Sequence, residues 1–289
     1  MKLLKYFFQF CAIFALFCIF KTIGYKNASN FGSKVGRVLG KLIRSNKIIL
    51  KNISQISKNS DFIVEDEDKL VKDVFSNYGR ILSDYVYLSK FRKGSLKEYV
   101  NIKGNNYLEE IKSKNKKVVF ISGHFNNFEL MAMFIDSAGI KLSTIYRPLN
   151  NVFLNKVMEN IRIKHICKNQ IKKGLDGLRE IFRFLKNNYS IAMMIDQRVR
   201  QGEKVNFFKK KAHTTNLPAL IAKKFKCQIV TIKIKRFENN KFKITIEKPI
   251  TFSENETSES ITSKLNTWIE KAILENPSQW IWTHNRWKN

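Results

Sequence analysis

The sequence is poor in the residues that define several classes of protein. Its 289 residues include only four Cys, four Pro and twelve Gly. The cysteines form no Cys-x-x-Cys pair, and no His pair lies beside them at a metal-ligand spacing. A disulfide scaffold and a zinc site are therefore poor interpretations, and a reducing, cytosol-facing environment fits better. The low Pro and Gly content also excludes collagen-like chains and Pro-rich linkers.

Acidic residues are few as well, with 24 Asp and Glu against 53 Lys and Arg, which gives a formal net charge of +29. Hydrophobic residues make up 44% of the chain, enough to bury a core, which argues against a disordered polycation. The excess charge fits either a Lys-rich solvated surface or an anionic partner, such as phosphate headgroups, an acidic carrier protein or nucleic acid. Charge alone does not choose among these.

The most apolar run lies at the amino terminus, where residues 6–20 read YFFQFCAIFALFCIF. A helix of this length covers about 22 Å, less than the roughly 30 Å hydrocarbon core of a bilayer. A short tilted span, a half-inserted anchor, the apolar part of a signal peptide and a buried core helix all remain open. No convincing cleavage site follows, and the Lys-rich chain downstream suits the anionic cytosolic leaflet. We therefore predict a membrane anchor over residues 1–26.

Beyond the anchor, the apolar pattern changes from helical to strand-like. Helical spacing prevails over residues 27–110. Short buried strands then alternate with helices, with strands predicted at 116–122, 142–147 and 191–196 and helices at 152–166 and 175–188. This alternation predicts an α/β fold with a mostly parallel central sheet flanked by helices.

The last part of the chain has a different pattern. Two alternating strands at 228–237 and 241–250 predict a hairpin. A helix follows at 257–275, and the chain ends in an aromatic and basic segment. No linker rich in Pro, Gly or Ser divides residues 27–289, so we predict one domain behind the anchor.

The most informative stretch is SGHFNNFE, residues 122–129, where a predicted strand ends and a helix should begin. In open α/β sheets, ligand crevices form at the carboxyl ends of strands. Gly123 permits a tight turn and the close approach of a ligand. Asn126 or Asn127 could cap the following helix.

His124 and Glu129 are the two residues of this stretch that suggest catalysis. On one ideal helix they would stand roughly 140° apart, so they can meet only if His124 sits in the loop and Glu129 in the first turns of the helix. A carboxylate that binds one imidazole nitrogen raises the basicity of the other, which can then take a proton from a hydroxyl. The alternative is a capping His and a surface Glu.

The stretch GHFNNFE resembles the His-x4-Asp/Glu motif of glycerolipid-type acyltransferases. More narrowly, the chain resembles the lipid A late acyltransferases, the lauroyl/myristoyl transferase family. Four later segments agree with that family in order, namely IYRPLNN (145–151), IDQ (195–197), GEKVNFF (202–208) and QWIWTHNRWK (279–288). The sequence departs from the family at 209–215, where KKKAHTT replaces a Gly followed by Pro-Ala-x-Thr. This departure affects the shape of the local loop and leaves the predicted base untouched.

The resemblance implies transfer of a fatty acyl chain from an acyl carrier protein to a free hydroxyl of a lipid A precursor. His124 would be the general base, and Glu129 would orient it and stabilise the imidazolium. No Ser or Cys stands in a nucleophile elbow, so direct transfer is preferred over an acyl-enzyme. No metal, nucleotide or other cofactor is required.

Five further residues are candidates for substrate binding. A guanidinium can hold phosphate or carboxylate through two hydrogen bonds, which favours Arg147 after its predicted strand. Asp196 also ends a strand and could position Arg147 or a loop. The predicted set is completed by Gln197, Asn127 and Arg286. We expect the first two tryptophans of the closing segment to pack in the interior.

The expected partners are the acyl carrier protein, the lipid A precursor and anionic inner-leaflet lipids, with no nucleic acid. The expected location is the bacterial inner membrane, with the catalytic domain facing the cytoplasm. Three alternatives stay open. The acceptor could be another lipid, such as glycerol phosphate, a lysophospholipid or a glycolipid. The chain could instead be a basic, membrane-tethered binding protein or a noncatalytic family member.

Overall fold

A seven-stranded sheet forms the centre of the protein, as seen in a computed structural model that describes residues 2–288. Its strands follow the order β1-β9-β8-β2-β5-β3-β4. They are β1 (Val100–Lys103), β2 (Val119–Ser122), β3 (Leu142–Tyr146), β4 (Gln170–Lys172), β5 (Ser190–Met194), β8 (Ile229–Arg236) and β9 (Phe242–Ile246). Every neighbouring pair is parallel except β8 with β9. The predicted α/β fold with a mostly parallel sheet is confirmed.

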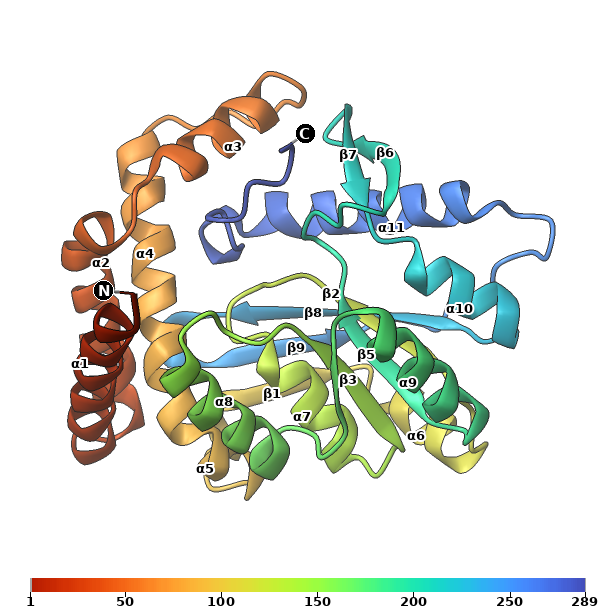
Figure 1. The fold of residues 1–289 in the computed structure, drawn as a ribbon, viewed down its shortest axis with the longest axis horizontal. Coiled ribbons are helices and arrows are strands. Elements are labelled where there is room, and N and C mark those ends of the chain that lie inside the picture. The colour runs from red at the N-terminus through yellow and green to blue at the C-terminus, as the bar shows by residue number, and fades with distance from the viewer. Residues whose placement is uncertain (1, 289) are drawn as a thin grey trace.

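Helices surround the sheet (Figure 1). They are α1 (Lys2–Thr22), α2 (Tyr25–Ile43), α3 (Lys47–Ser57), α4 (Glu67–Asp84), α5 (Leu88–Arg92), α6 (Asn105–Ser113), α7 (Glu129–Ser137), α8 (Val152–His165), α9 (Leu175–Lys186), α10 (Leu217–Phe225) and α11 (Ser258–Glu275). In Figure 1, α10 and α11 lie above the sheet and α5 and α7 below it, while α1, α2 and α4 stand together at one end. Helices therefore cover both faces of the sheet.

Strand β2 shows why the sheet is buried on both sides. Val119 and Ile121 point into one hydrophobic core, while Phe120 points into the other. Successive side chains of a strand face opposite ways, so a strand covered by helices on both faces reads as a continuous apolar run. This is the pattern that identified the strand in the sequence.

A second, two-stranded sheet was not predicted. It pairs β6 (Glu203–Phe207) with β7 (Lys210–Thr214) in an antiparallel hairpin. The two turn residues between the strands, Phe208 and Lys209, have φ angles of 49° and 55°. Such a turn favours Gly, which explains the shape of the divergent 209–215 segment: Lys209 adopts here a conformation that glycine takes more easily.

Helix α1 runs further than the predicted apolar stretch. It has 21 residues, and an 18-residue window within it has a mean hydropathy of 2.1, so α1 is long and apolar enough to cross a membrane by length and composition. Only Phe20 is buried among its residues. The observation argues against a buried core helix, because most residues of α1 are exposed. The division into an anchor (1–26) and one domain (27–289) stays a prediction.

Candidate active site

The register of β2 and β5 places His124 next to Asp196. These strands are parallel neighbours, and Ser122 at the end of β2 lies opposite Met194 at the end of β5. His124 and Asp196 each stand two residues further along the chain. Their side chains meet, with His124 Nδ1 2.7 Å from Asp196 Oδ1. The sheet thus brings a base and an acid together that are 72 residues apart.

Asp196 is fully enclosed and well supplied with donors. Its Oδ2 accepts hydrogen bonds from the backbone N–H of His124 (2.9 Å) and from Trp280 Nε1 (2.8 Å). Burial raises the pKa of the Asp196 carboxyl, but the neighbouring His124 and these hydrogen bonds outweigh it and hold the pKa below its usual value. The carboxylate therefore stays ionised and favours the His124 tautomer that carries its proton on Nδ1.

The other ring nitrogen of His124 is available for chemistry. No hydrogen bond involving Nε2 is formed within residues 2–288, and 18% of the side chain is exposed. The Phe128 ring packs edge-on against the imidazole, with centroids 4.7 Å apart. An imidazole that donates from Nδ1 to a carboxylate and keeps Nε2 free is the arrangement of a general base.

Glu129 does not hold His124, which corrects the predicted pairing. Its Oε1 accepts hydrogen bonds from Tyr85 Oη (2.7 Å) and from Arg162 Nε (2.8 Å) and Nη2 (2.6 Å). Glu129 is the first residue of α7, while Arg162 comes from the last turn of α8. The carboxylate therefore turns toward α8 and ties the start of α7 to it.

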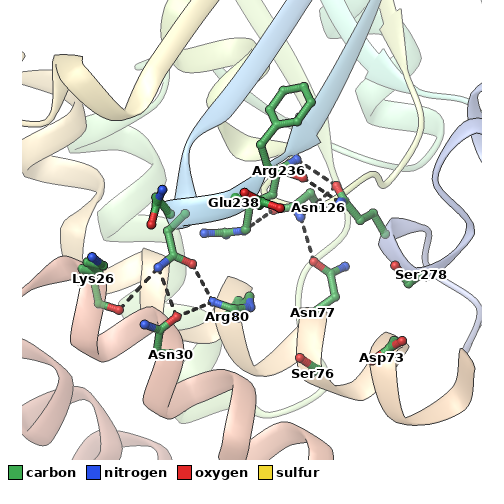
Figure 2. Close-up of a pocket in the computed structure, with 14 residues that line it drawn as sticks. Lys26, Asn30, Asp73, Ser76, Asn77, Arg80, Asn126, Arg236, Glu238 and Ser278 are labelled. Carbon is green, nitrogen blue, oxygen red and sulfur yellow. Dashed lines mark hydrogen bonds between the residues drawn. The ribbon is translucent and has the colours of Figure 1, made fainter. Parts of the chain in front are cut away.

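The loop between His124 and Glu129 is also held from behind (Figure 2). The backbone N–H of Asn126 donates to Gln279 O (2.8 Å), and its Nδ2 donates to Asn77 Oδ1 (2.8 Å). These three residues line a polar cavity of about 390 Å³ that does not include His124. The contacts fix the loop in the left-handed conformation of Asn126, whose φ is 45°.

Asn127 lies on the buried side of this loop. Its Nδ2 donates to Asp84 Oδ2 (3.2 Å), and Asp84 also pairs with the guanidinium of Arg236. Its exposed fraction is 1%, which favours a packing role over the predicted substrate contact. Helix α7 has Phe128 as its N-cap and no side-chain cap, so the predicted capping by an Asn is wrong.

Two cations stand on the same edge of the sheet as the His124–Asp196 pair. Tyr146 of β3 lies opposite Lys172 of β4, so Arg147 and Lys173 follow side by side. Arg147 is exposed and forms no hydrogen bond or ion pair within residues 2–288. Partial loss of hydration, and then the charge of Arg147, lower the pKa of Lys173, which is still exposed. Arg147 was predicted, whereas Lys173 was missed, although both directly follow strands.

A second imidazole, His284, lies close to the pair. Its Nε2 accepts a hydrogen bond from the backbone N–H of Arg198 (2.9 Å). Burial lowers the pKa of His284 to about 4, and charges on Asp196 and His124 also act on it. His284 is therefore neutral near pH 7 and fixes the loop after Asp196. Gln197, in that loop, is half-buried, and its predicted substrate contact stays a prediction.

Arg286 lies in the core. It is fully buried, donating from Nη1 to His213 O (2.8 Å) and from Nη2 to Thr214 Oγ1 (2.5 Å). The structure thus supports a packing role that joins the closing segment to β7, in place of the predicted substrate contact. Trp280 and Trp282 are also fully buried, as expected. Trp280 has the additional role of donor to Asp196.

Comparison with known proteins identifies related acyltransferases. The chain is 22% identical to the lipid A biosynthesis palmitoleoyltransferase of Escherichia coli (strain K12) over 228 residues, which cover 78% of this chain and 73% of that protein. It is 20% identical to the lipid A biosynthesis myristoyltransferase of the same organism over 257 residues, which cover 86% of this chain and 77% of that protein.

A lipid A biosynthesis acyltransferase of Haemophilus influenzae (strain ATCC 51907 / DSM 11121 / KW20 / Rd) is 22% identical over 198 residues, covering 67% of this chain and 62% of that protein. The family model for bacterial lipid A biosynthesis acyltransferases matches residues 1–289. The family and the names of these relatives indicate an acyltransferase, in agreement with the predicted enzyme class. The chain belongs to the bacterial lipid A biosynthesis acyltransferase family.

Proposed function

We propose that this protein transfers a fatty acyl chain from an acyl carrier protein to a hydroxyl of a lipid A precursor, with His124 as the general base. The observation that carries the proposal is the 2.7 Å contact between His124 Nδ1 and Asp196 Oδ1. It fixes the imidazole so that Nε2 is the nitrogen that accepts a proton. Family membership supplies the substrate class.

The proposed reaction is a direct transfer. Nε2 of His124 takes the proton of the acceptor hydroxyl while the oxygen attacks the thioester carbonyl. The tetrahedral intermediate then collapses and the carbon–sulfur bond breaks. The leaving thiolate takes the proton from the imidazolium. The ionised carboxylate of Asp196 stabilises the imidazolium while it exists.

The surroundings support direct transfer over an acyl-enzyme. Ser122 is the hydroxyl nearest in sequence to His124, but it is fully buried and donates to Ile232 O (2.7 Å). Cys167 is buried as well, and burial raises the pKa of its thiol to about 12. Neither group has the access or the ionisation that a nucleophile needs.

Glu129 has a positioning role in this proposal. His124 and Glu129 stand at the two ends of a short loop, and each end is held by a different partner. Arg162 and Tyr85 fix the start of α7, so the spacing between the two residues sets how far the loop reaches back to Asp196. In this proposal the first residue of the motif, His124, is the base, and the last, Glu129, anchors the start of α7.

The two cations after β3 and β4 are proposed to bind the anionic part of a substrate. Arg147 and Lys173 lie beyond β5 from His124 along the strand order, and Arg147 is exposed. A phosphate of a lipid A precursor, or that of the carrier's prosthetic arm, fits a paired guanidinium and ammonium. The formal charge of +29 favours docking of an acidic carrier protein.

We also propose that the enzyme works at the cytoplasmic face of the bacterial inner membrane. Helix α1 has the length and hydropathy of a membrane helix. The proposed acceptor and product of the enzyme are lipids, and anionic inner-leaflet lipids would attract its basic surface. No metal or other cofactor takes part in the proposed steps.

The test is an assay of the purified full-length enzyme with a carrier-bound acyl donor and a lipid A precursor, read by mass spectrometry of the product. We expect one added acyl chain with the wild-type enzyme and none with His124→Ala. His165→Ala is the matched control, because His165 is a partly buried histidine that forms no hydrogen bond from its side chain within residues 2–288. A near-normal rate for His124→Ala, or acylation of a lysophospholipid in preference to the precursor, would overturn the assignment.

A further inference from the structure

Helix α2 buries small residues and exposes large apolar ones, which is the reverse of a surface helix on a water-soluble protein. The residues that it buries are small apart from Tyr25, namely Ala28, Ser29, Gly32, Ser33 and Gly40. The large apolar residues point outward, with Val38 70%, Leu42 82% and Ile43 78% exposed. An amphipathic helix on a soluble protein turns its large apolar residues toward the core.

The small residues allow α2 to pack very closely on α4. A Cβ on Gly36 would stand 2.1 Å from the carbonyl oxygen of Phe75, and one on Gly79 would stand 1.9 Å from that of Gly32. Small residues between helices, with large apolar residues facing away, are the usual arrangement in lipid. The outward-facing apolar residues of α2 therefore fit a lipid-facing surface better than an incomplete protein core.

Helices α1 and α2 pack against each other, and both carry exposed large apolar residues. Phe31 of α2 packs against Phe20 of α1, with ring centroids 6.1 Å apart. Helix α1 is also held to the rest of the protein near both ends: Asn151 Nδ2 donates to Tyr6 O (2.9 Å), and the Tyr87 hydroxyl bonds Phe20 O. It lies along the protein instead of projecting from it, next to α2 (Figure 1).

The charge of this region fits anionic lipid. The first acidic residue of the chain is Asp61, so α1, α2 and α3 carry only basic charges. Arg37 and Lys41 pair with acids on α4, whereas Lys34, Arg44 and Lys47 are exposed. Long basic side chains beside an apolar helix face can reach the headgroups while the apolar residues enter the acyl region.

We infer that the outward face of α2, formed by Phe31, Val38, Leu39, Leu42 and Ile43, inserts into the surface of an anionic bilayer next to α1. The lipid-contacting region then reaches residue 43, beyond the predicted anchor boundary at 26. The protein lies against the membrane along two helices, which does not depend on the acyl-transfer proposal.

The test uses fluorescent labels at single cysteines in the full chain, reconstituted into vesicles that contain anionic lipid. Cys11, Cys18 and Cys227 are replaced by Ala, while Cys167 is buried and stays. An environment-sensitive probe is attached at Val38→Cys or Leu42→Cys. Leu220→Cys is the matched control, because Leu220 is an exposed leucine (46%) on α10, at the other end of the protein (Figure 1).

We expect blue-shifted, several-fold brighter emission at positions 38 and 42 and strong quenching by nitroxide groups on the lipid chains, with neither effect at position 220. The effect should weaken in vesicles of zwitterionic lipid alone. Water-like emission at position 42 would overturn the inference. So would a blue shift that appears without vesicles and grows with protein concentration, since a second copy of the chain would then cover the face. No substrate is needed, so failure here is distinct from failure of the proposed function.

Discussion

The carboxylates of Asp196 and Glu129 stand near the same loop but have different kinds of partner. Asp196 accepts one hydrogen bond from an indole, one from a backbone amide and one from an imidazole that can gain and lose a proton. Glu129 accepts its bonds from a phenol and from the permanently charged guanidinium of Arg162. The first carboxylate can respond to a proton transfer, whereas the second is already neutralised.

In the proposed mechanism the two carboxylates have different roles, because Asp196 takes part in the proton transfer and Glu129 supports the structure of the site. A carboxylate that faces a titratable group can stabilise the charge that develops there during a reaction. A carboxylate paired with arginine in a largely buried site contributes geometry, because removal of either partner leaves an unpaired charge. The contrast predicts different losses when each acid is made neutral.

Asp196→Asn should have the largest effect. To keep accepting from Trp280 and from the His124 amide, the new side chain must turn its NH₂ group toward Nδ1. His124 is then driven to the tautomer with its proton on Nε2, which removes the base. We expect kcat/KM to fall by about a hundredfold or more, measured with the carrier-bound donor and lipid acceptor.

The control for this variant is a thermal unfolding curve, which should show a folded protein at the assay temperature, because Asn keeps the shape of Asp and can still accept from Trp280 and the His124 amide. A near-normal rate would contradict the division of roles. Glu129 would then be the remaining candidate for the carboxylate that supports the base.

Glu129→Gln should cost stability. The side chains of Glu129 and Arg162 are 9% and 11% exposed, so the variant leaves a nearly buried cation without its counter-charge. We expect the free energy of unfolding to fall by about 3 kcal/mol, measured by denaturant titration in detergent. Adding Arg162→Met should restore much of this loss, because no lone charge remains. Losses that simply add in the double variant would show that the two groups do not interact.

The sequence was enough to predict the class of the sheet and five of its seven strands, because these read as short apolar or alternating runs, whereas β1 and β4 were not predicted. It also located His124, which follows directly after such a run. Asp196, the partner of His124, could not be predicted from the spacing of residues along the chain. Only the order of the strands shows that β5 lies beside β2, and only their register shows that Asp196 reaches as far as His124.

Three other features could not be predicted from the sequence. Glu129 turns to α8 because Arg162 and Tyr85 meet there, and neither residue is near it in the sequence. Arg286 stands in a recognisable closing segment, yet it is a core residue that no local pattern marks as buried. The β6–β7 hairpin was missed because its turn has Phe208 and Lys209 where Gly or Asn is usual.

The neutral imidazole of His284 should make stability depend on pH in the neighbourhood of Asp196. Its folded pKa of about 4 lies below its ordinary value of 6.5, so the unfolded chain takes up a proton first as the pH falls. Stability is therefore complete above about pH 6.5 and decreases between pH 6.5 and 4. The contribution of Asp196, whose pKa is lowered from 3.8, is lost only at still lower pH. We expect the unfolding temperature to drop less between pH 7 and 5 in His284→Gln than in the wild type, and parallel curves would contradict the account.

Removing one hydrogen-bond donor from each carboxylate gives the finest comparison. Trp280→Phe deletes the indole N–H at Asp196, and Tyr85→Phe deletes the hydroxyl at Glu129. Each change should cost about 1–2 kcal/mol of stability, because both donors bond an ionised acceptor. Only Trp280→Phe should also slow turnover, by about tenfold, since Asp196 then holds the imidazole less firmly. Tyr85→Phe should leave the rate within about a factor of two, because Arg162 still holds Glu129. An equal loss of rate in both variants would mean that the two carboxylates act as one network, and the separation of chemistry from support would fail.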